Sequence, residues 1–229
     1  MTGSHTLPRA VISTDALVEG ARAAQEHGGS VADLRGDAYG HGAMEIAPAL
    51  RDAGVRSLVV DDRDVALRLA EDGFDVSTTA APDLDAALLY GWPGSGIRPA
   101  MRLSAALIST KPLRRGEAVS YGYTHRSAAD THVALVTGGY AQGIVRALGN
   151  NAEVEIGGVM HPIIGRVAMD VCVVDLQTAD EPQVDGVEVV YFGGTGPARE
   201  NLATWAAVTG LGVAELIAVA GAKAVRTWI

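Results

Sequence analysis

The first part of the chain alternates apolar runs typical of buried strands with stretches typical of helices. We predict strands at AVIST (10–14), SVADLRG (30–36), SLVVDD (57–62) and FDVSTTA (74–80), and a helix at GAMEIAPALRDAG (42–54). Thr14 or Asp15 could cap a helix after the first strand, and Asp61 or Asp62 one after the third. Strands that alternate with helices through short connections predict a parallel sheet, here built from only about three units.

From YGWPGSGIRPAM (90–101) onward, glycine and proline cluster and the apolar positions alternate with period two. We predict strands at THVALVTGGY (131–140), AEVEI (152–156), VMHPII (159–164), GRVAMDVCVVDL (165–176) and VEVVYFGG (187–194). Helices near 200–210 and 214–221 and a short strand at 224–229 complete the pattern. This texture predicts a small antiparallel barrel or sandwich. We therefore expect two domains, 8–92 and 93–229.

Composition and charge narrow the class of protein. Hydrophobic residues make up 48% of the 229 positions, which predicts a packed core. The net charge of −9 argues against nucleic acid as a partner, because phosphate contacts need a concentrated basic face. No leader-like or membrane-spanning pattern is present, so we expect a cytoplasmic protein without membrane contact. The single cysteine, Cys172, is expected in the core, and the isolated His41 predicts a structural loop residue rather than a metal site.

The segment DLRGDAYGHGA (33–43) resembles the cofactor-anchoring signature of alanine racemases, which reads lysine, a small residue, Asp or Asn, then AYGHG. Further resemblances follow in the order of that family: LYG with IRPAM (89–101), GEAVSYG (116–122), GYAQG (139–143), GRVAMD (165–170) and YFGGTG (191–196). Together they identify the chain as a member of the alanine racemase family from near residue 8 to its last residue.

The resemblance implies a fold and a chemistry. In the family, an eight-stranded α/β barrel binds pyridoxal 5'-phosphate, and a β-domain from the partner subunit closes the site where L- and D-alanine interconvert. It implies that Tyr121 is the catalytic base on one face of the substrate and that Tyr39 contacts the cofactor phosphate. Met169 matches a residue near the substrate carboxylate, and Tyr140 one near the entrance. Ordinary core roles are the alternative for these last two residues.

Two departures oppose catalysis. Arg35 occupies the position of the cofactor lysine, and a guanidinium that stays protonated cannot form an imine, so covalent attachment at position 35 is not expected. The only other lysines, Lys111 and Lys223, align with the β-domain. A closed α/β barrel takes about 250 residues, and the alternating pattern ends near residue 90. We predict an incomplete TIM-type α/β barrel, with its missing block near 80–88, followed by an antiparallel β-domain of the alanine racemase C-terminal type.

Smaller changes in the same region point the same way. Pro48 falls inside the predicted helix after YGHG, and Ala214 occupies the position of another phosphate-contacting tyrosine of the family. Asp170 is expected to accept hydrogen bonds from nearby backbone donors.

Two functional hypotheses follow. The first is an alanine racemase-like isomerase, with alanine as substrate by resemblance only, that is inactive as an isolated chain. The second is a non-catalytic binding or assembly partner, which forms a homo-oligomer or a heterodimer with a full-length racemase and supplies Tyr121 in trans. A pyridoxal phosphate carrier without chemistry, or a relic of an internal deletion, are further alternatives.

Overall fold

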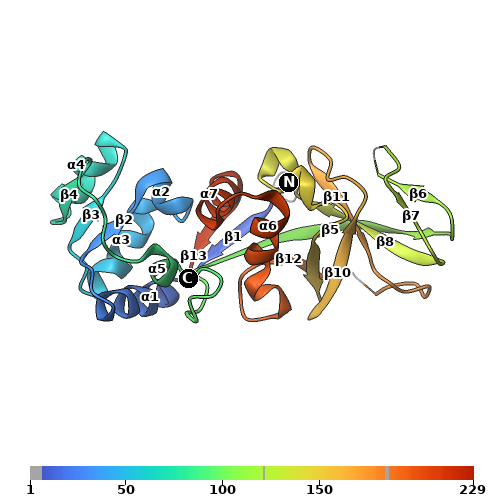
Figure 1. Ribbon diagram of the computed structural model, residues 1–229, viewed down its shortest axis with the longest axis horizontal. Coiled ribbons are helices and arrows are strands. Elements are labelled where there is room, and N and C mark those ends of the chain that lie inside the picture. The colour runs from blue at the N-terminus through green and yellow to red at the C-terminus, as the bar shows by residue number, and fades with distance from the viewer. Residues whose placement is uncertain (1–6, 121, 184–185) are drawn as a thin grey trace.

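The computed structural model describes residues 7–120, 122–183 and 186–229, which form an elongated molecule with an α/β part at one end and a β-barrel at the other (Figure 1). The α/β part contains three strands and five helices: β2 (Val31–Asp33), β3 (Ser57–Val59), β4 (Asp75–Ser77), α1 (Thr14–Glu26), α2 (Arg35–Tyr39), α3 (Ala43–Asp52), α4 (Arg63–Glu71) and α5 (Ala86–Tyr90).

The remaining elements form the barrel, its extensions and two helices beside it. They are β1 (Arg9–Ile12), β5 (Met101–Leu113), β6 (Ala118–Val119), β7 (His125–Arg126), β8 (Thr131–Thr137), β9 (Glu153–Ile156), β10 (Val159–Ile164), β11 (Val171–Asp175), β12 (Glu188–Phe192), α6 (Asn201–Thr209), α7 (Val213–Lys223) and β13 (Val225–Trp228). Three 3₁₀ turns, η1 (Tyr140–Gln142), η2 (Arg146–Leu148) and η3 (Pro197–Glu200), lie in the connections.

Strands β2, β3 and β4 form a parallel sheet in that order, as predicted from the alternation of apolar runs and helices. Side chains cap the N-termini of two helices: Asp62 accepts hydrogen bonds from the first amides of α4, and Asp85 accepts from those of α5. Ser13, rather than the expected Thr14 or Asp15, caps α1, because its hydroxyl accepts from the amide of Ala16. Pro48 does lie inside α3, and the helix continues through it to Asp52.

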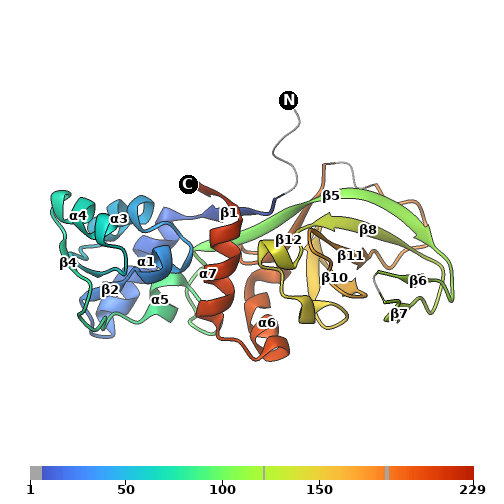
Figure 2. The same ribbon diagram turned by 90° about the horizontal axis from the view of Figure 1, so that it is seen from above.

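The larger sheet runs in the order β12-β9-β10-β11-β8-β5-β1-β13, and an additional pairing between β12 and β5 closes six of its strands into an antiparallel barrel. The predicted antiparallel barrel is therefore confirmed. Strand β1, which the sequence pattern associated with the α/β part, lies outside the three-stranded sheet. It pairs antiparallel with β5 and parallel with β13, and so connects the barrel sheet to the C-terminal strand (Figures 1 and 2).

One hydrophobic core runs through both parts. Buried side chains of the α/β part, such as Leu17 and Leu58, belong to the same contiguous cluster as Val136 and Trp205 of the barrel part. Cys172 is buried in this cluster, as expected, with its sulfur 3.2 Å from the hydroxyl of Tyr191. The two parts are thus packed against each other through apolar contacts.

The outer edge of β2 is covered by the segment that leads into α5. The carboxylate of Asp83 accepts hydrogen bonds from the amides of Ser30 and Val31, and the carbonyl of Val31 accepts from the amides of Asp83 and Leu84. The hydroxyl of the fully buried Tyr90 donates to the carbonyl of Asp33 at 2.8 Å. Both backbone polar groups of Val31 and the carbonyl of Asp33 at this edge are therefore satisfied from within the chain.

Over the part of the chain that the structure describes, no single helix is both long and apolar enough to cross a membrane. Only the bent pair Pro197–Thr209 with Val213–Lys223, angled at 113°, has the combined length and composition.

Candidate functional site

The segment that resembles the cofactor-anchoring signature forms a single left-handed turn after β2. Gly36, Asp37, Ala38 and Tyr39 all have positive φ, between 52° and 62°. Three consecutive non-glycine residues in this region are costly, at about 1–2 kcal/mol each. The surrounding structure must therefore supply contacts that hold this turn.

Those contacts come from residues of the α/β part and from the C-terminal elements α7 and β13. The Asp37 carboxylate accepts from the amide of Ala43 and forms an ion pair with Arg226 of β13, and the amide of Gly36 donates to Asp61. At Gly40, with φ of 78°, a Cβ would lie 2.8 Å from the carbonyl oxygen of Ala218 in α7. Only glycine permits this approach of the turn to the helix.

Arg35 begins the turn, and its guanidinium is bound to Asp33 at the end of β2. The Arg35 Nε donates to one carboxylate oxygen of Asp33 at 2.8 Å, and Nη2 donates to the other at 2.6 Å. The hydroxyl of Tyr39 donates to Asp33 at 2.7 Å. The Asp33 side chain is only 6% exposed, whereas that of Arg35 is 50% exposed. We call this group of Arg35, Asp33 and Tyr39 the carboxylate triad. Its hydrogen bonds provide the buried Asp33 carboxylate with partners from within the group.

Burial and hydrogen bonding shift the pKa values of all three groups. Burial raises the pKa of Asp33, but the hydrogen bonds from Arg35 and Tyr39 together outweigh it and hold that pKa below its usual value. The hydrogen bond to Asp33 raises the pKa of Arg35 further. Burial, together with the bond to Asp33, raises the pKa of Tyr39 to about 12. At neutral pH the triad is a neutral phenol and a fixed ion pair, with no group poised to exchange protons.

Aromatic rings fill the space beside the triad. Tyr39 makes edge contacts with Tyr90 and Trp92, at centroid distances of 5.4 and 5.3 Å. His41 packs against Tyr90 at 4.6 Å and is fully buried, with Nδ1 2.8 Å from the carbonyl of Ala38. This agrees with the structural role expected for His41.

The cavity next to the turn, of about 440 Å³, is acidic. Its wall carries the carboxylates of Asp37, Asp61 and Asp62 among the apolar side chains of Leu34, Val60 and Val65, and no lysine or arginine lines it. Within residues 7–120, 122–183 and 186–229, no group of three His, Cys, Asp or Glu residues is arranged to hold a metal ion. Asp37 is paired with Arg226, but Asp61 and Asp62 form no ion pair with a described residue, so the wall repels an anion and has no lining cation to bind one.

The other residues implied by the resemblance do not join this group. Tyr121 lies outside the described residues. Met169 lies between β10 and β11 in the barrel part and is 55% exposed, and Tyr140 of η1 is 44% exposed, which excludes the alternative of core roles for both. Asp170 accepts from the side-chain amide of Gln142 at 2.8 Å rather than from the backbone donors we expected. Sequence reasoning missed Asp33, although a carboxylate at the end of an apolar strand was a visible signal.

Comparison with protein families gives two overlapping matches. The model of the alanine racemase N-terminal domain matches residues 12–161, and that of the alanine racemase C-terminal domain matches residues 100–228. The chain belongs to the alanine racemase family. This confirms the resemblance read from the motifs.

Alanine racemases with similar sequences include that of Mycolicibacterium vanbaalenii, 37% identical over 134 residues, and that of Corynebacterium efficiens, 43% identical over 120 residues. These matches cover 58% and 50% of this chain, but only 34% and 33% of the relatives. The matched part therefore spans about a third of the length of the curated alanine racemases.

Solved alanine racemases share the fold. The enzyme from Streptomyces lavendulae superposes with a TM-score of 0.82 at 19% identity, covering 99% of this chain and 98% of that one. The enzyme from Bartonella henselae, solved with covalently bound pyridoxal phosphate, gives a TM-score of 0.77 at 17% identity, covering 97% and 99%. At these identities the likeness shows the fold alone.

Around Arg35, where the resemblance places the family's cofactor lysine, the residues present do not fit pyridoxal phosphate. The guanidinium of Arg35 stays protonated, so it has no free nitrogen lone pair with which to form an imine. The Asp33 carboxylate accepts hydrogen bonds from this guanidinium and from the Tyr39 hydroxyl. A cofactor phosphate in the adjoining cavity would face three aspartates. No reaction step through the cofactor can be derived from this arrangement.

Proposed function

We propose that this chain is a non-catalytic member of the alanine racemase family that assembles with a racemase subunit instead of converting alanine itself. The observation that carries the proposal is the two-point ion pair between Arg35 and Asp33 at the position of the family's lysine. An amine that can lose its proton is the minimum requirement for the family's covalent chemistry, and that position does not provide one.

The two lysines of the chain offer no replacement. Lys111 lies on the exposed end of β5, and Lys223 is the exposed last residue of α7. Neither lines the cavity beside the left-handed turn. For either lysine to act, the cofactor would have to bind outside this cavity.

The assembly role is supported by the contrast between the two parts. Residues 93–229, which we propose as a separate domain from 8–92, carry the closed six-stranded barrel and match the family's C-terminal domain along nearly their whole length. The segment GEAVSYG, with strand β6 just before Tyr121, lies in this part. A β-domain of this kind can serve a partner's site, since in the family the resemblance places Tyr121 across the subunit boundary.

The first test is spectroscopic. The purified chain is mixed with pyridoxal phosphate, reduced with borohydride and desalted, beside the Lys111→Arg and Lys223→Arg variants. We expect the spectrum of free cofactor and no retained adduct in any of them. A reducible adduct in the wild-type protein that disappears in one variant would show that this lysine has taken over the role and would contradict the loss of covalent chemistry.

The second test addresses assembly. The chain is titrated into a full-length alanine racemase at micromolar concentration, and the masses of the species are measured by light scattering. We expect a mixed dimer whose racemase turnover depends on Tyr121, so that the matched Tyr121→Phe variant associates equally but lowers turnover. Absence of a mixed species at this concentration would rule out the assembly role while leaving the spectroscopic result unaffected.

A further inference from the structure

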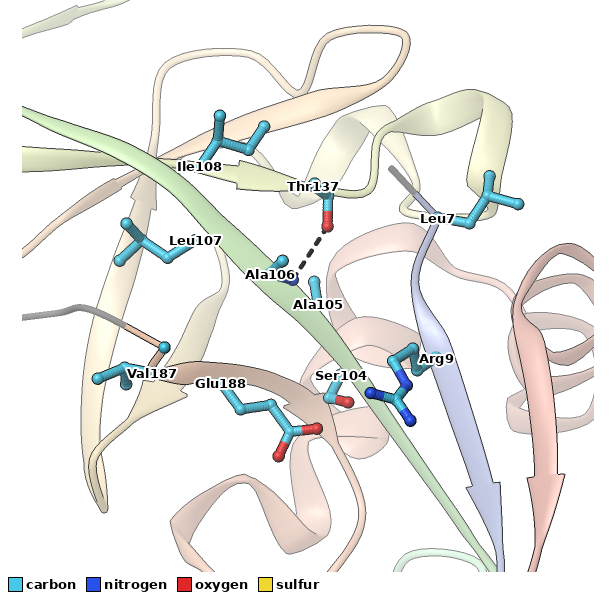
Figure 3. Close-up of a pocket in the computed structure, with 11 residues that line it drawn as sticks. Leu7, Arg9, Ser104, Ala105, Ala106, Leu107, Ile108, Thr137, Val187 and Glu188 are labelled. Atoms are coloured by element: carbon cyan, nitrogen blue, oxygen red, sulfur yellow. Dashed lines mark hydrogen bonds between the residues drawn. The ribbon is translucent and has the colours of Figure 1, made fainter. Parts of the chain in front are cut away.

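A second cavity, of about 710 Å³, lies far from the carboxylate triad, where β1, β5 and β12 come together (Figure 3). On one edge of β5, β1 pairs only with Met101–Ser104, and β8 begins to pair only at Leu107. The gap between these two strands opens the cavity over the middle of β5. Its volume is within the range of about 300–1,000 Å³ typical of small-molecule sites.

Charged and polar side chains gather at one end of this cavity. Figure 3 shows the guanidinium of Arg9, the hydroxyl of Ser104 and the carboxylate of Glu188 turned toward one another. Glu188 is already bound by Arg102 at 2.6 Å, which lowers the pKa of its carboxylate. Arg9 forms no ion pair with any described residue. Of the two charged side chains that line the cavity, Arg9 is therefore the one without an ion pair, although its charge helps to lower the pKa of Glu188.

Ser104 supplies a second polar group without a partner. Its side chain is fully buried, and its hydroxyl makes no hydrogen bond of normal geometry with any described residue, although it approaches the Glu188 carboxylate closely enough to help lower its pKa. A buried hydroxyl without a partner is unfavourable, at about 1–3 kcal/mol by mutational data. A ligand that accepts a hydrogen bond here would remove that penalty.

The rest of the wall is apolar. Leu7, Leu107, Ile108 and Val187 line it, and Ala105 and Ala106 form its floor on β5. Ile108 is 53% exposed and Leu7 is 42% exposed. An apolar chain bound in the cavity would cover them.

We propose that this cavity binds a small monocarboxylate with an apolar chain. The carboxylate lies between the guanidinium of Arg9 and the hydroxyl of Ser104, and the chain extends along Leu107, Ile108 and Val187. One cation without an ion pair and one hydroxyl match a single carboxylate, whereas a phosphate group would call for more donors than the wall provides. The site is independent of the cofactor position and of the proposed assembly role.

The test uses hexanoate as the probe and the full chain, by isothermal titration calorimetry with a thermal melt of each variant as a check of folding. Arg9→Gln is expected to weaken hexanoate binding about tenfold, because it removes a charge-assisted hydrogen bond. Arg22→Gln is the matched control, since Arg22 is exposed on α1 and lies away from the cavity, and it should leave binding unchanged.

Two further variants separate binding from folding. Ser104→Ala should weaken hexanoate about threefold to fivefold, yet leave the melting temperature equal or higher, because it removes a buried hydroxyl that lacks a partner. Ala106→Leu should fill the cavity and abolish binding without changing any charge. Hexanamide, which has no charge, should bind at least about tenfold more weakly than hexanoate.

Three outcomes would overturn the proposal. They are an absence of saturable hexanoate binding at millimolar concentration, binding that Arg9→Gln and Ala106→Leu both leave unchanged, and equal affinity for hexanamide. The last would show an apolar cavity without carboxylate recognition.

Discussion

At the scale of single residues, Asp33 accounts for the arginine at position 35. A carboxylate buried at the end of β2 would be strongly unfavourable alone, and Arg35 and Tyr39 supply the three side-chain hydrogen bonds that compensate it. The arginine is thus part of a satisfied network.

Removing Arg35 should therefore expose the dependence of Asp33 on it. We expect Arg35→Met to lower the free energy of unfolding by about 1–2 kcal/mol, less than for a fully buried pair because half of the arginine side chain is in water. The double variant Asp33→Leu/Arg35→Met should recover most of this loss, because no buried charge remains. Urea unfolding of wild type, Arg35→Met, Asp33→Leu and the double variant measures the coupling, and additive effects would contradict it.

The same pair predicts a response to acid. Because the folded-state pKa of Asp33 lies below its usual value of 3.8, its stabilisation is complete above that pH and is lost as pH falls through the folded-state pKa. The stability difference between wild type and Asp33→Asn should stay constant over the range of about pH 5–8, where stability commonly peaks. It should shrink below pH 3.8. A difference that grows in acid would show that the pair is not formed.

His41 predicts a second pH dependence, at milder acidity. Burial lowers its pKa to about 4 from 6.5, so the unfolded chain takes up a proton before the folded chain does. Its contribution is fully present above pH 6.5 and is lost as pH falls toward 4, by up to about 3 kcal/mol. The unfolding free energy should therefore fall more steeply between pH 7 and 4 in the wild type than in His41→Gln, and an equal slope in both proteins would contradict this.

The sequence allowed the role of a residue to be predicted where one role is much the commonest for that residue type in its local context. The burial of Cys172 followed from its apolar neighbours, and the structural role of His41 followed from its isolation from other possible metal ligands, although its complete burial was not predicted. The partners of Asp33 and Asp170 could not be read in the same way, because a carboxylate accepts from any donor that the fold brings near, and Tyr39 and Gln142 become neighbours only through the turn geometry.

At the scale of elements, β2 shows how a three-stranded parallel sheet avoids an open edge on one side. The amides and carbonyl of Val31 and Ser30 are bound by the Asp83 and Leu84 segment, and Tyr90 closes the end of the strand. Such covering suppresses pairing with another chain at this edge.

Loss of the Tyr90 hydroxyl should loosen that edge. We expect Tyr90→Phe to destabilise the fold by about 1–2 kcal/mol, since the buried carbonyl of Asp33 loses its donor while the ring packing is kept. Hydrogen exchange should quicken at the amides of β2 and not at those of β11, which serves as the internal reference. Uniform quickening in both strands would indicate global destabilisation only.

The sequence predicted the type of most elements but not the sheet that each one joins. The run AVIST has the same apolar texture as the strands of the parallel sheet, yet β1 pairs with β5 and β13. Local periodicity reports which face of a strand is buried, and it carries no information on the partner strand when that partner is far along the chain. Among the period-two runs, β9, β10 and β11 pair with near neighbours along the chain, which favours an antiparallel arrangement, whereas the β12–β5 pairing that closes the barrel joins distant segments.

At the scale of the whole molecule, the continuous core makes the two parts energetically dependent. Buried residues from α1 to α7 belong to one apolar cluster, and this cluster is not interrupted at the boundary proposed near residue 92. We expect a single calorimetric transition with equal van't Hoff and calorimetric enthalpies. Two separate transitions would show instead that 8–92 and 93–229 unfold as independent domains.

Strand β1 lies between β5 and β13, and residues 9–12 therefore complete their pairing only with residues 225–228. At synthesis rates of about 5–20 residues per second, the earliest strand waits roughly 10–40 s for its last neighbour. During that time one edge of β1 stays open on the ribosome. The order in which the chain is made, as well as its final contacts, thus determines when this protein is protected from aggregation.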